Sequence, residues 1–353
     1  MREVIEDVLR WAGEGLPVAV ATVVSTKGSV PRSVGAKMAL APNYRIAGSV
    51  SGGCVEGALY ESGLSVLNSG RPQLLRFGIS EARAFETVGL ACGGEIAVWV
   101  ERLDDQRRAF WERAYRAEHS AVVLSVVEGA PEWQGAWLAY DMDAATLEAH
   151  GLPQAEIPNL QAHALTALRQ GEPRLFSTQV EGRSLRVFAD VLLPRPTLVI
   201  VGATHIAIAL TSLAHVLGFR VVVVDPRGAF NNAERFPHAD ERIVEHPQRA
   251  FTKLRMHRAT AVAVLSHNER FDDPALIAAL QSEAFYVGAL GSQRTQAQRR
   301  ARLLASGLSE EALNRLHGPI GLRIGARTPE EIALAVMAEI IATQRVVPPA
   351  AAC

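Results

Sequence analysis

A basic, turn-rich segment near the amino end of the chain has the composition of an anion-binding loop. Residues 27–37, KGSVPRSVGAK, hold Lys27, Arg32 and Lys37 among glycines and hydroxyl groups. Cations and the N–H groups of such turns together suit a phosphate or another anion. The alternative is that this segment is a solvent-exposed basic loop that binds no ligand.

A second segment places a cysteine at the start of a predicted helix. Residues 48–54, GSVSGGC, bring Gly52 and Gly53 directly before Cys54, and the apolar spacing of a helix follows. The N–H groups at the amino end of a helix stabilise a phosphate or a thiolate. A packed, inert cysteine is the alternative, because free cysteine is often buried.

The pairing of cysteine with glycines recurs at Cys92, Gly93 and Gly94, just before an apolar, strand-like run. Two cysteines beside glycine turns suit a soft metal or a sulfur-bearing ligand. Cys54 and Cys92 are therefore the candidates for such a contact. Neither cysteine has the spacing of a zinc site, and Cys353 lies in an Ala/Pro tail without an assigned role.

The second half of the chain contains a strand–turn–helix pattern typical of nucleotide binding. In the run VIVGATHIAIAL, Gly202 marks the turn, and Asp225 ends the next strand, where a carboxylate can hold ribose hydroxyls. Thr204 replaces the glycine that lets the backbone approach a pyrophosphate. The alternative for Asp225 is a strand-ending residue before a proline.

Further polar residues are predicted at the carboxyl ends of parallel strands, where open α/β sheets bind ligands. Gly291 and Ser292 precede a helix, and with Arg294 they could hold a phosphate, or form only a loop and an N-cap. His205 and His267 are either bases or hydrogen-bonded structural groups.

The order of the predicted elements divides the chain into two domains. A chain of 353 residues has the length of about two domains, and two prolines before an apolar strand mark a linker. We expect an α/β protein with a mixed α/β first domain and a Rossmann-like, doubly wound parallel sheet in the second. We expect the first domain to comprise residues 1–193, with its motifs in 1–103 and a less readable part in 104–193. The second domain is expected at 194–345, followed by a flexible tail at 346–353.

Composition narrows the class of protein. Lys and Arg number 36 against 37 Asp and Glu, so no global field attracts nucleic acid or a membrane surface. The three cysteines suggest a reducing compartment. Because no apolar run is long enough for a membrane span and no export signal is visible, we expect a cytoplasmic protein.

Together these motifs resemble the XdhC/CoxI family, the maturation factors of xanthine dehydrogenase and related molybdenum hydroxylases. In the first domain the resemblance rests on TVVSTKGSVPRSVGAKM, GSVSGGCVEGAL and ACGGEIAVWV. In the second it rests on VVVVDPR, RFPHAD, YVGALGSQRT and HGPIGLRIGARTPEEIALAVMAEIIA. The family's Gly-Ala-Gly-His is here Gly-Ala-Thr-His, residues 202–205.

The resemblance implies a chaperone more than an enzyme. Such a protein binds the molybdenum cofactor (molybdopterin), supports its sulfuration together with a cysteine desulfurase, and delivers it to apo xanthine dehydrogenase or a related hydroxylase. Cys54 would lie nearest the molybdenum or sulfur, with Cys92 as the second motif cysteine. Lys27, Arg32 and Lys37 would neutralise the pterin phosphate, and the amides of Gly52 and Gly53 would complete its cradle.

Two other classes of function remain open, and the oligomeric state is a separate expectation. An NAD(P)-dependent oxidoreductase would use the second domain, and a nucleotide-sensing adaptor would bind AMP or NAD without the pterin. We expect a homodimer, since a two-domain chaperone can build a shared cleft from two copies.

Overall fold

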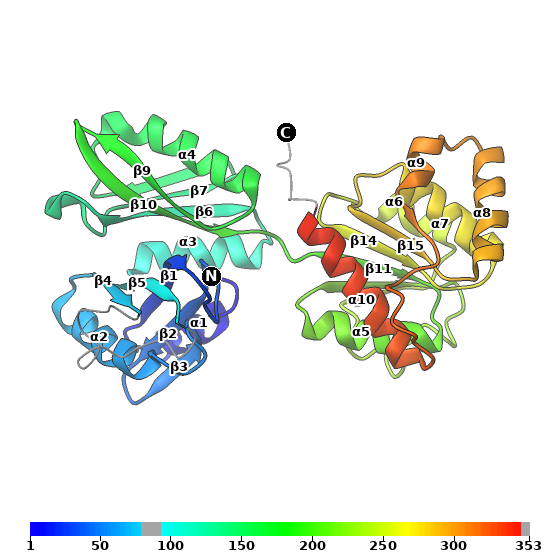
Figure 1. Ribbon diagram of the computed structural model, residues 1–353, viewed down its shortest axis with the longest axis horizontal. Coiled ribbons are helices and arrows are strands. Elements are labelled where there is room, and N and C mark those ends of the chain that lie inside the picture. Colours follow the sequence, from blue (N-terminus) through cyan, green and yellow to red (C-terminus); the bar gives the residue numbers. More distant parts are fainter. Residues whose placement is uncertain (79–92, 347–353) are drawn as a thin grey trace. The chain divides into compact units, whose positions relative to one another are not determined.

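The computed structural model describes residues 1–78 and 93–346. The chain divides into two compact units, Met1–Pro194 and Arg195–Cys353. The first unit contains two sheets and the second unit contains one (Figure 1). Separate clusters of buried apolar side chains lie in each unit.

The first unit begins with a five-stranded antiparallel sheet. Its order is β3-β2-β1-β5-β4. Helix α2 covers one face, because Ile96 and Val98 of β5 share a core with Leu59 of the helix. Trp99, which lies between inward-facing residues, points to the opposite face, as the two-residue period of a strand requires. The elements are α1 (Ile5–Gly13), β1 (Ala19–Lys27), β2 (Lys37–Ala41), β3 (Arg45–Gly48), α2 (Glu56–Ser69), β4 (Gln73–Phe77) and β5 (Glu95–Arg102).

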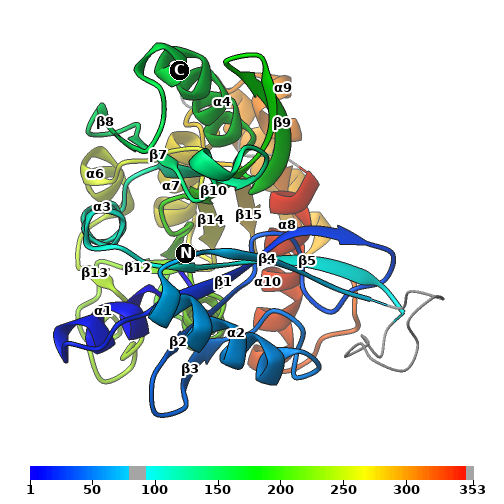
Figure 2. The same ribbon diagram turned by 90° about the vertical axis from the view of Figure 1, so that its left-hand side faces the viewer.

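A second five-stranded antiparallel sheet, of order β8-β7-β6-β10-β9, packs on the first. Trp99, Val127 and Phe188 join the two facing sheets, and α4 covers the outer face of the second (Figure 2). The part of the sequence without a recognisable motif therefore forms a full layer of this unit. Its elements are α3 (Asp105–Arg116), β6 (Ala121–Glu128), η1 (Pro131–Trp133), β7 (Trp137–Asp141), β8 (Thr146–His150), η2 (Gln154–Glu156), α4 (Ile157–Gln170), β9 (Arg174–Val180) and β10 (Arg183–Leu192).

The second unit is a six-stranded sheet in which every strand pairing is parallel. Its order is β13-β12-β11-β14-β15-β16, so the first and fourth strands of the unit lie side by side, as in dinucleotide-binding sheets. The strands are β11 (Thr197–Val201), β12 (Arg220–Val224), β13 (Glu241–Ile243), β14 (Thr260–Val264), β15 (Tyr286–Ala289) and β16 (Leu316–His317).

Helices cover both faces of this sheet. Ile200 shares a core with residues of α5 and α10, whereas Val199, its neighbour on β11, packs with residues of α6, α7 and α8. A sheet buried on both faces needs continuous apolar strands, and β11 and β14 are buried throughout. The predicted doubly wound, Rossmann-like sheet is thus confirmed. The helices are α5 (His205–Val216), α6 (Pro247–Lys253), α7 (Glu269–Leu280), α8 (Gln293–Ala305), α9 (Glu310–Asn314) and α10 (Pro329–Val346).

Side-chain caps fix where several of these helices begin. The hydroxyl of Thr204 accepts the Ala207 N–H at 3.4 Å at the start of α5. At α10, the Glu331 N–H donates to the Thr328 hydroxyl at 3.3 Å, and the Thr328 N–H donates to the Glu331 carboxylate at 3.1 Å. This reciprocal capping box satisfies donors that the first helical turn leaves unpaired.

Candidate functional site

The loop that carries Cys54 lies directly before helix α2 in the first unit. Cys54 is exposed, as are Gly52 and Gly53, whose backbones are left-handed with φ of 72° and 117°. Val50 and Val55 on either side are fully buried in the core beneath the first sheet. The thiol is therefore exposed on a turn that the buried side chains of Val50 and Val55 hold in place at both ends.

The carboxylate of Glu56, the first residue of α2, folds back into this loop. Its Oε1 accepts the Ser49 hydroxyl at 2.6 Å and the Ser51 N–H at 2.9 Å. Its Oε2 accepts the Gly53 N–H at 2.9 Å and also bonds the Ser51 hydroxyl. Burial opposes ionisation, but these hydrogen bonds lower the pKa of Glu56 to about 2. The ionised carboxylate of Glu56 thus fixes the conformation of the loop by accepting hydrogen bonds from Ser49, Ser51 and Gly53.

This arrangement corrects the expected role of the two glycine amides. The Gly53 N–H donates to Glu56 and the Gly52 N–H donates to the Ser49 hydroxyl at 2.8 Å. The amide concavity that we expected to cradle a phosphate is therefore filled by the chain's own carboxylate. The Cys54 side chain remains exposed on this loop.

The Glu56 anchor makes the loop sensitive to acid. A pKa lowered from 4.5 to about 2 means that the stabilisation is complete above pH 4.5 and is lost as the pH falls toward 2. We expect the amides of Ser51 and Gly53 to exchange hydrogen about tenfold faster in Glu56→Gln at pH 7. Native-state hydrogen exchange measures this effect.

The exposed Glu61 on the same helix provides the matched control. Glu61→Gln should leave exchange in the loop unchanged, and Glu56→Gln should flatten its dependence on pH between 4.5 and 2. Equal exchange rates in the two variants at pH 7 would show that Glu56 does not hold the loop.

The three cations expected at a phosphate have different environments. Lys37 is buried, with its ammonium 2.9 Å from Asp190 of β10 and 2.8 Å from the Thr22 hydroxyl. This buried ion pair neutralises the Lys37 ammonium within the protein, which corrects the expectation that Lys37 contacts a bound phosphate. Arg32 pairs with Glu3 at the surface. Lys27 is the most exposed of the three, with its Nζ 3.9 Å from Glu95.

The structure brings the loop of Lys27 together with the glycine turn before β5. A Cβ on Gly94 would lie 2.0 Å from the Ser29 carbonyl oxygen, so only glycine allows this approach. Gly93 is exposed beside it. Cys92 lies outside the described residues. Two of the motif segments thus meet where β1 ends and β5 begins.

In the second unit, Gly202 and Asp225 have structural partners. A Cβ on Gly202 would lie 2.7 Å from backbone atoms of Ser266, so the turn after β11 packs against the end of β14. The buried Asp225 carboxylate accepts the Ala203 N–H at 2.8 Å and three N–H groups of Arg227 at 2.6 to 2.9 Å. Burial opposes ionisation, yet the bonds from Arg227 and Ala203 keep the pKa of Asp225 below its ordinary value. Both carboxylate oxygens therefore accept hydrogen bonds from donors of the chain itself.

The other predicted residues of this unit lie at the carboxyl ends of the strands. His205 is the first residue of α5 and is exposed, and His267, also exposed, follows β14 with a left-handed φ of 57°. Ser292 is the N-cap of α8, where its hydroxyl accepts the Thr295 N–H at 3.2 Å. Gly291 precedes it with φ of 135°, and Arg294 is exposed in the first turn. Ser292 therefore forms an N-cap, which is one of the two roles that the sequence predicted for it.

A buried ion pair that the sequence analysis missed supports this edge of the sheet. Asp272 of α7 lies 3.0 Å from the guanidinium of Arg299 on α8, and both side chains are almost fully buried. Asp272 also bonds the Ser266 hydroxyl, and Arg299 donates to the Leu290 carbonyl at 3.1 Å. The loops after β14 and β15 are therefore fixed to each other. An Asp in α7 and an Arg one helix later gave no local signal of this pairing.

Within residues 1–78 and 93–346, no helix is long and apolar enough to cross a bilayer. In the same residues, no three His, Cys, Asp or Glu side chains gather into a metal-ligand group.

The fold and the site define a two-unit α/β protein that pairs an exposed cysteine loop with a Rossmann-type sheet. Residues 198–340 match the family model described as the XdhC Rossmann domain, and residues 11–78 match the model of the XdhC and CoxI family. The chain belongs to the XdhC and CoxI family.

Similar proteins match nearly the whole chain. A Bacillus subtilis protein, named as a probable subunit of xanthine dehydrogenase, is 29% identical over 92% of this chain and 93% of its own length. The Escherichia coli molybdenum cofactor insertion chaperone PaoD is 28% identical over 94% of this chain and 86% of its own. A Bacillus halodurans crystal structure, described as a xanthine dehydrogenase, is 26% identical with a TM-score of 0.79 and covers 99% of this chain and 97% of its own.

Proposed function

We propose that this protein is a maturation chaperone that binds the molybdenum cofactor, supports its sulfuration and inserts it into xanthine dehydrogenase or a related molybdenum hydroxylase. The observation that carries the proposal is the exposed Cys54 on a loop anchored by Glu56. A thiol is a soft ligand that suits a metal such as molybdenum, and it also suits contact with a sulfur atom. Support comes also from PaoD, a relative named as an insertion chaperone for this cofactor.

The residues of the first unit have separate tasks in this proposal. Cys54 contacts the molybdenum or the sulfur that is exchanged, and Cys92 with Gly93 forms a second contact. Lys27 and Arg32 supply positive charge for the cofactor phosphate, because both cations lie at the surface. Glu56 acts as a positioning residue, since it holds the loop without facing the ligand.

The second unit is proposed to bind a nucleotide-like group at the carboxyl ends of its strands. Gly202 and Thr204 form the turn there, and His205, His267 and the Gly291–Arg294 segment surround the adjacent ends. Asp225 would act indirectly, by fixing the Ala203 amide. An NAD(P)-dependent oxidoreductase is disfavoured, since both oxygens of Asp225 already accept hydrogen bonds from the chain and a ribose would have to displace Arg227.

Partners and location complete the proposal. A cysteine desulfurase would supply the sulfur, the apo-hydroxylase would receive the cofactor, and a cytoplasmic homodimer would carry out both exchanges. The Bacillus subtilis relative supports a hydroxylase partner, because its name associates it with xanthine dehydrogenase.

An anaerobic maturation assay tests this function. The purified full-length protein is loaded with molybdenum cofactor and incubated with cofactor-free xanthine dehydrogenase, a cysteine desulfurase and cysteine. We expect more active, sulfido-containing enzyme than the same amount of free cofactor yields. Equal activation with and without the protein would contradict the proposal.

A further inference from the structure

The segment between β16 and α10 exposes apolar side chains beside one turn of that helix. Leu322 and Ile324 are 43% and 53% exposed, and Leu334 of α10 is 53% exposed. The Leu322 N–H donates to the Ala335 carbonyl at 3.1 Å, so the segment lies against the turn that carries Leu334. We call these three side chains, Leu322, Ile324 and Leu334, the apolar patch. They are not among the residues that the proposed function uses.

Hydrogen bonds hold this segment against the sheet and against α10. The Ile320 N–H donates to the Ala289 carbonyl at the end of β15 at 3.1 Å. The Gly321 N–H donates to the Glu339 carboxylate of α10 at 2.8 Å. The same carboxylate accepts the hydroxyl of the buried Tyr286 of β15 at 2.6 Å. The apolar patch therefore lies on a backbone that strand and helix hold in one conformation.

Two arginines of the same segment carry charges without a carboxylate partner in the described part of the chain. Arg323 and Arg327 are both exposed, and neither forms an ion pair with a residue in 1–78 or 93–346. Two acids follow at the start of α10. The Glu331 carboxylate accepts the backbone N–H groups of Arg327 and Thr328, and it is therefore engaged in the cap of the helix. Arg323 thus leaves an unpaired guanidinium in the segment that carries the apolar patch.

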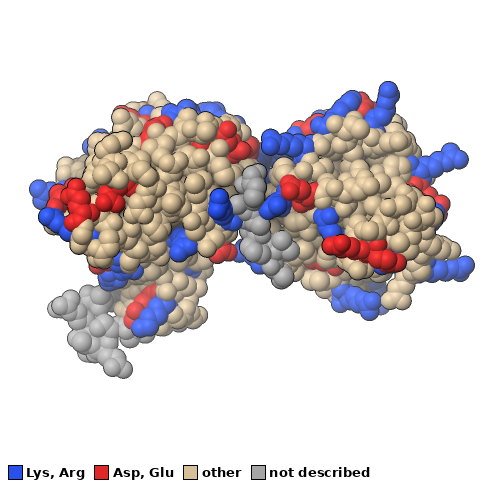
Figure 3. Space-filling view, turned by 90° about the horizontal axis from the view of Figure 1, so that it is seen from above, with Lys and Arg blue, Asp and Glu red and all other residues tan. Residues whose placement is uncertain are grey.

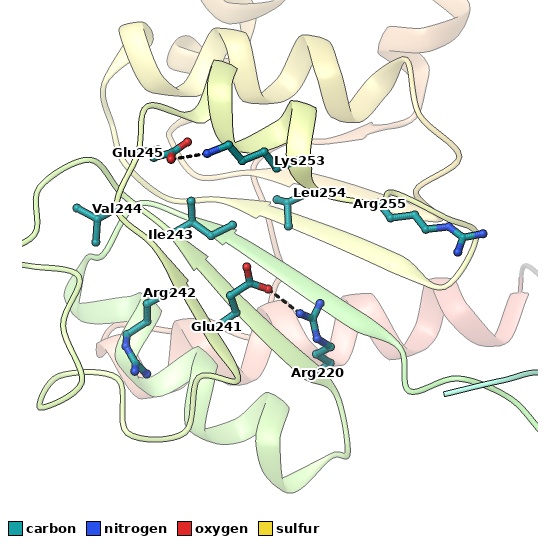
Figure 4. A pocket seen from close by; sticks show the side chains of 9 residues that line it. All are labelled: Arg220, Glu241, Arg242, Ile243, Val244, Glu245, Lys253, Leu254 and Arg255. Atoms are coloured by element: carbon teal, nitrogen blue, oxygen red, sulfur yellow. Dashed lines mark hydrogen bonds and ion pairs between the residues drawn. The ribbon is translucent and has the colours of Figure 1, made fainter. Parts of the chain in front are cut away.

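The opposite edge of the same sheet, beside β13, is built differently (Figure 4). Arg220 pairs there with Glu241 at 2.6 Å. Val244 is 49% exposed, whereas the apolar side chains Ile243 and Leu254, which line the same groove, are half-buried. Acidic and basic side chains are also interspersed over the face drawn in Figure 3. Val244 is therefore an isolated exposed side chain with which the apolar patch can be compared.

We propose that the apolar patch and Arg323 form a docking surface for the apo-hydroxylase that receives the cofactor. Neighbouring exposed apolar side chains are typical of protein-binding sites, and arginine is enriched among the residues that dominate binding energy. The unpaired guanidinium requires a complementary charge, so the hydroxylase surface should present apolar side chains with a carboxylate opposite Arg323. This inference rests on the proposed function, because it assigns a surface to one of the proposed partners.

The position of Cys54 is the reason for assigning the hydroxylase, rather than the desulfurase, to this surface. In the proposed function the desulfurase supplies sulfur to the exposed Cys54 of the first unit. The apolar patch lies in the second unit, Arg195–Cys353. Because the sulfur donor has to contact the thiol, the surface in the other unit is available to the acceptor enzyme.

Biolayer interferometry of the full-length protein on immobilised, cofactor-free xanthine dehydrogenase, and in parallel on cysteine desulfurase, tests this surface. We expect Ile324→Glu and Leu334→Glu to weaken binding to xanthine dehydrogenase at least about tenfold, because each puts a charge into the apolar contact. Arg323→Gln should weaken it about threefold and reduce its dependence on ionic strength. Val244→Glu and Arg255→Gln change exposed residues at the β13 edge (Figure 4) and, as matched controls, should leave binding unchanged.

The outcomes separate this inference from the proposed function. Unchanged binding by both apolar variants, or equal weakening by Val244→Glu, would overturn the docking surface while the unaltered protein still matures the hydroxylase. Weakened binding to the desulfurase alone would also overturn it, because the patch would then serve the other partner. The same holds if sedimentation velocity shows a dimer that Ile324→Glu dissociates, since a second copy would then occupy the patch. Failure of the unaltered protein to bind or activate xanthine dehydrogenase would contradict the proposed function and this inference with it.

Discussion

Replacing Cys54 with alanine is expected to abolish the support of hydroxylase maturation while leaving the fold intact. The thiol is exposed on the turn before α2, and its neighbours Val50 and Val55 supply the buried anchors. Loss of an exposed side chain changes stability by about 0.5 kcal/mol or less, whereas loss of the only sulfur on this loop removes its soft ligand. The sulfido content and activity of the matured hydroxylase measure the effect.

Cys54→Ser separates sulfur chemistry from shape, because serine has the same side-chain skeleton with oxygen in place of sulfur. We expect it to be as inactive as Cys54→Ala. Ser65→Ala, an exposed change on α2, is the control and should mature the hydroxylase normally. Full activity of Cys54→Ser would contradict a role for the sulfur atom.

Replacing Asp272 with alanine is expected to produce the largest loss of stability in the second unit. The substitution leaves the guanidinium of Arg299 buried without its carboxylate, which lies 3.0 Å away in the native protein. Breaking one partner of a buried pair costs about 3–5 kcal/mol. Urea unfolding followed by far-UV circular dichroism measures this loss.

The next residue in the chain supplies a matched control. Asp273 pairs with Arg302 at 2.8 Å, but both side chains are partly exposed, so Asp273→Ala should cost about 1 kcal/mol or less. All five tryptophans precede Pro194 and report on the first unit, so their fluorescence transition should remain at the native urea concentration. Equal destabilisation by the two substitutions would contradict the importance of the buried pair.

The parallel sheet of the second unit was predictable because its strands are continuous apolar runs that alternate with capped helices. The second sheet of the first unit was not. Its outer strands β8 and β9 are mostly exposed or half-buried and lack a long apolar run, and their pairing depends on partners distant in the chain. Local patterns do not contain that information.

The site shows the same division between local and distant information. The position of Cys54 before a helix followed from nearby glycines and apolar spacing. Burial of Lys37 could not be predicted, because its partner Asp190 lies on a strand of the other sheet. Glu56 had a usable signal, since serines followed at short spacing by a glutamate at a helix start are typical of a capping arrangement.

An anaerobic titration of the full-length protein with molybdenum cofactor, run beside NAD and repeated with Cys54→Ala, tests the central claim most directly. Our account predicts saturable binding of the molybdenum cofactor that the substitution weakens, without saturable binding of NAD. Tight binding of NAD with no binding of the molybdenum cofactor would contradict the account and assign the second unit an oxidoreductase role.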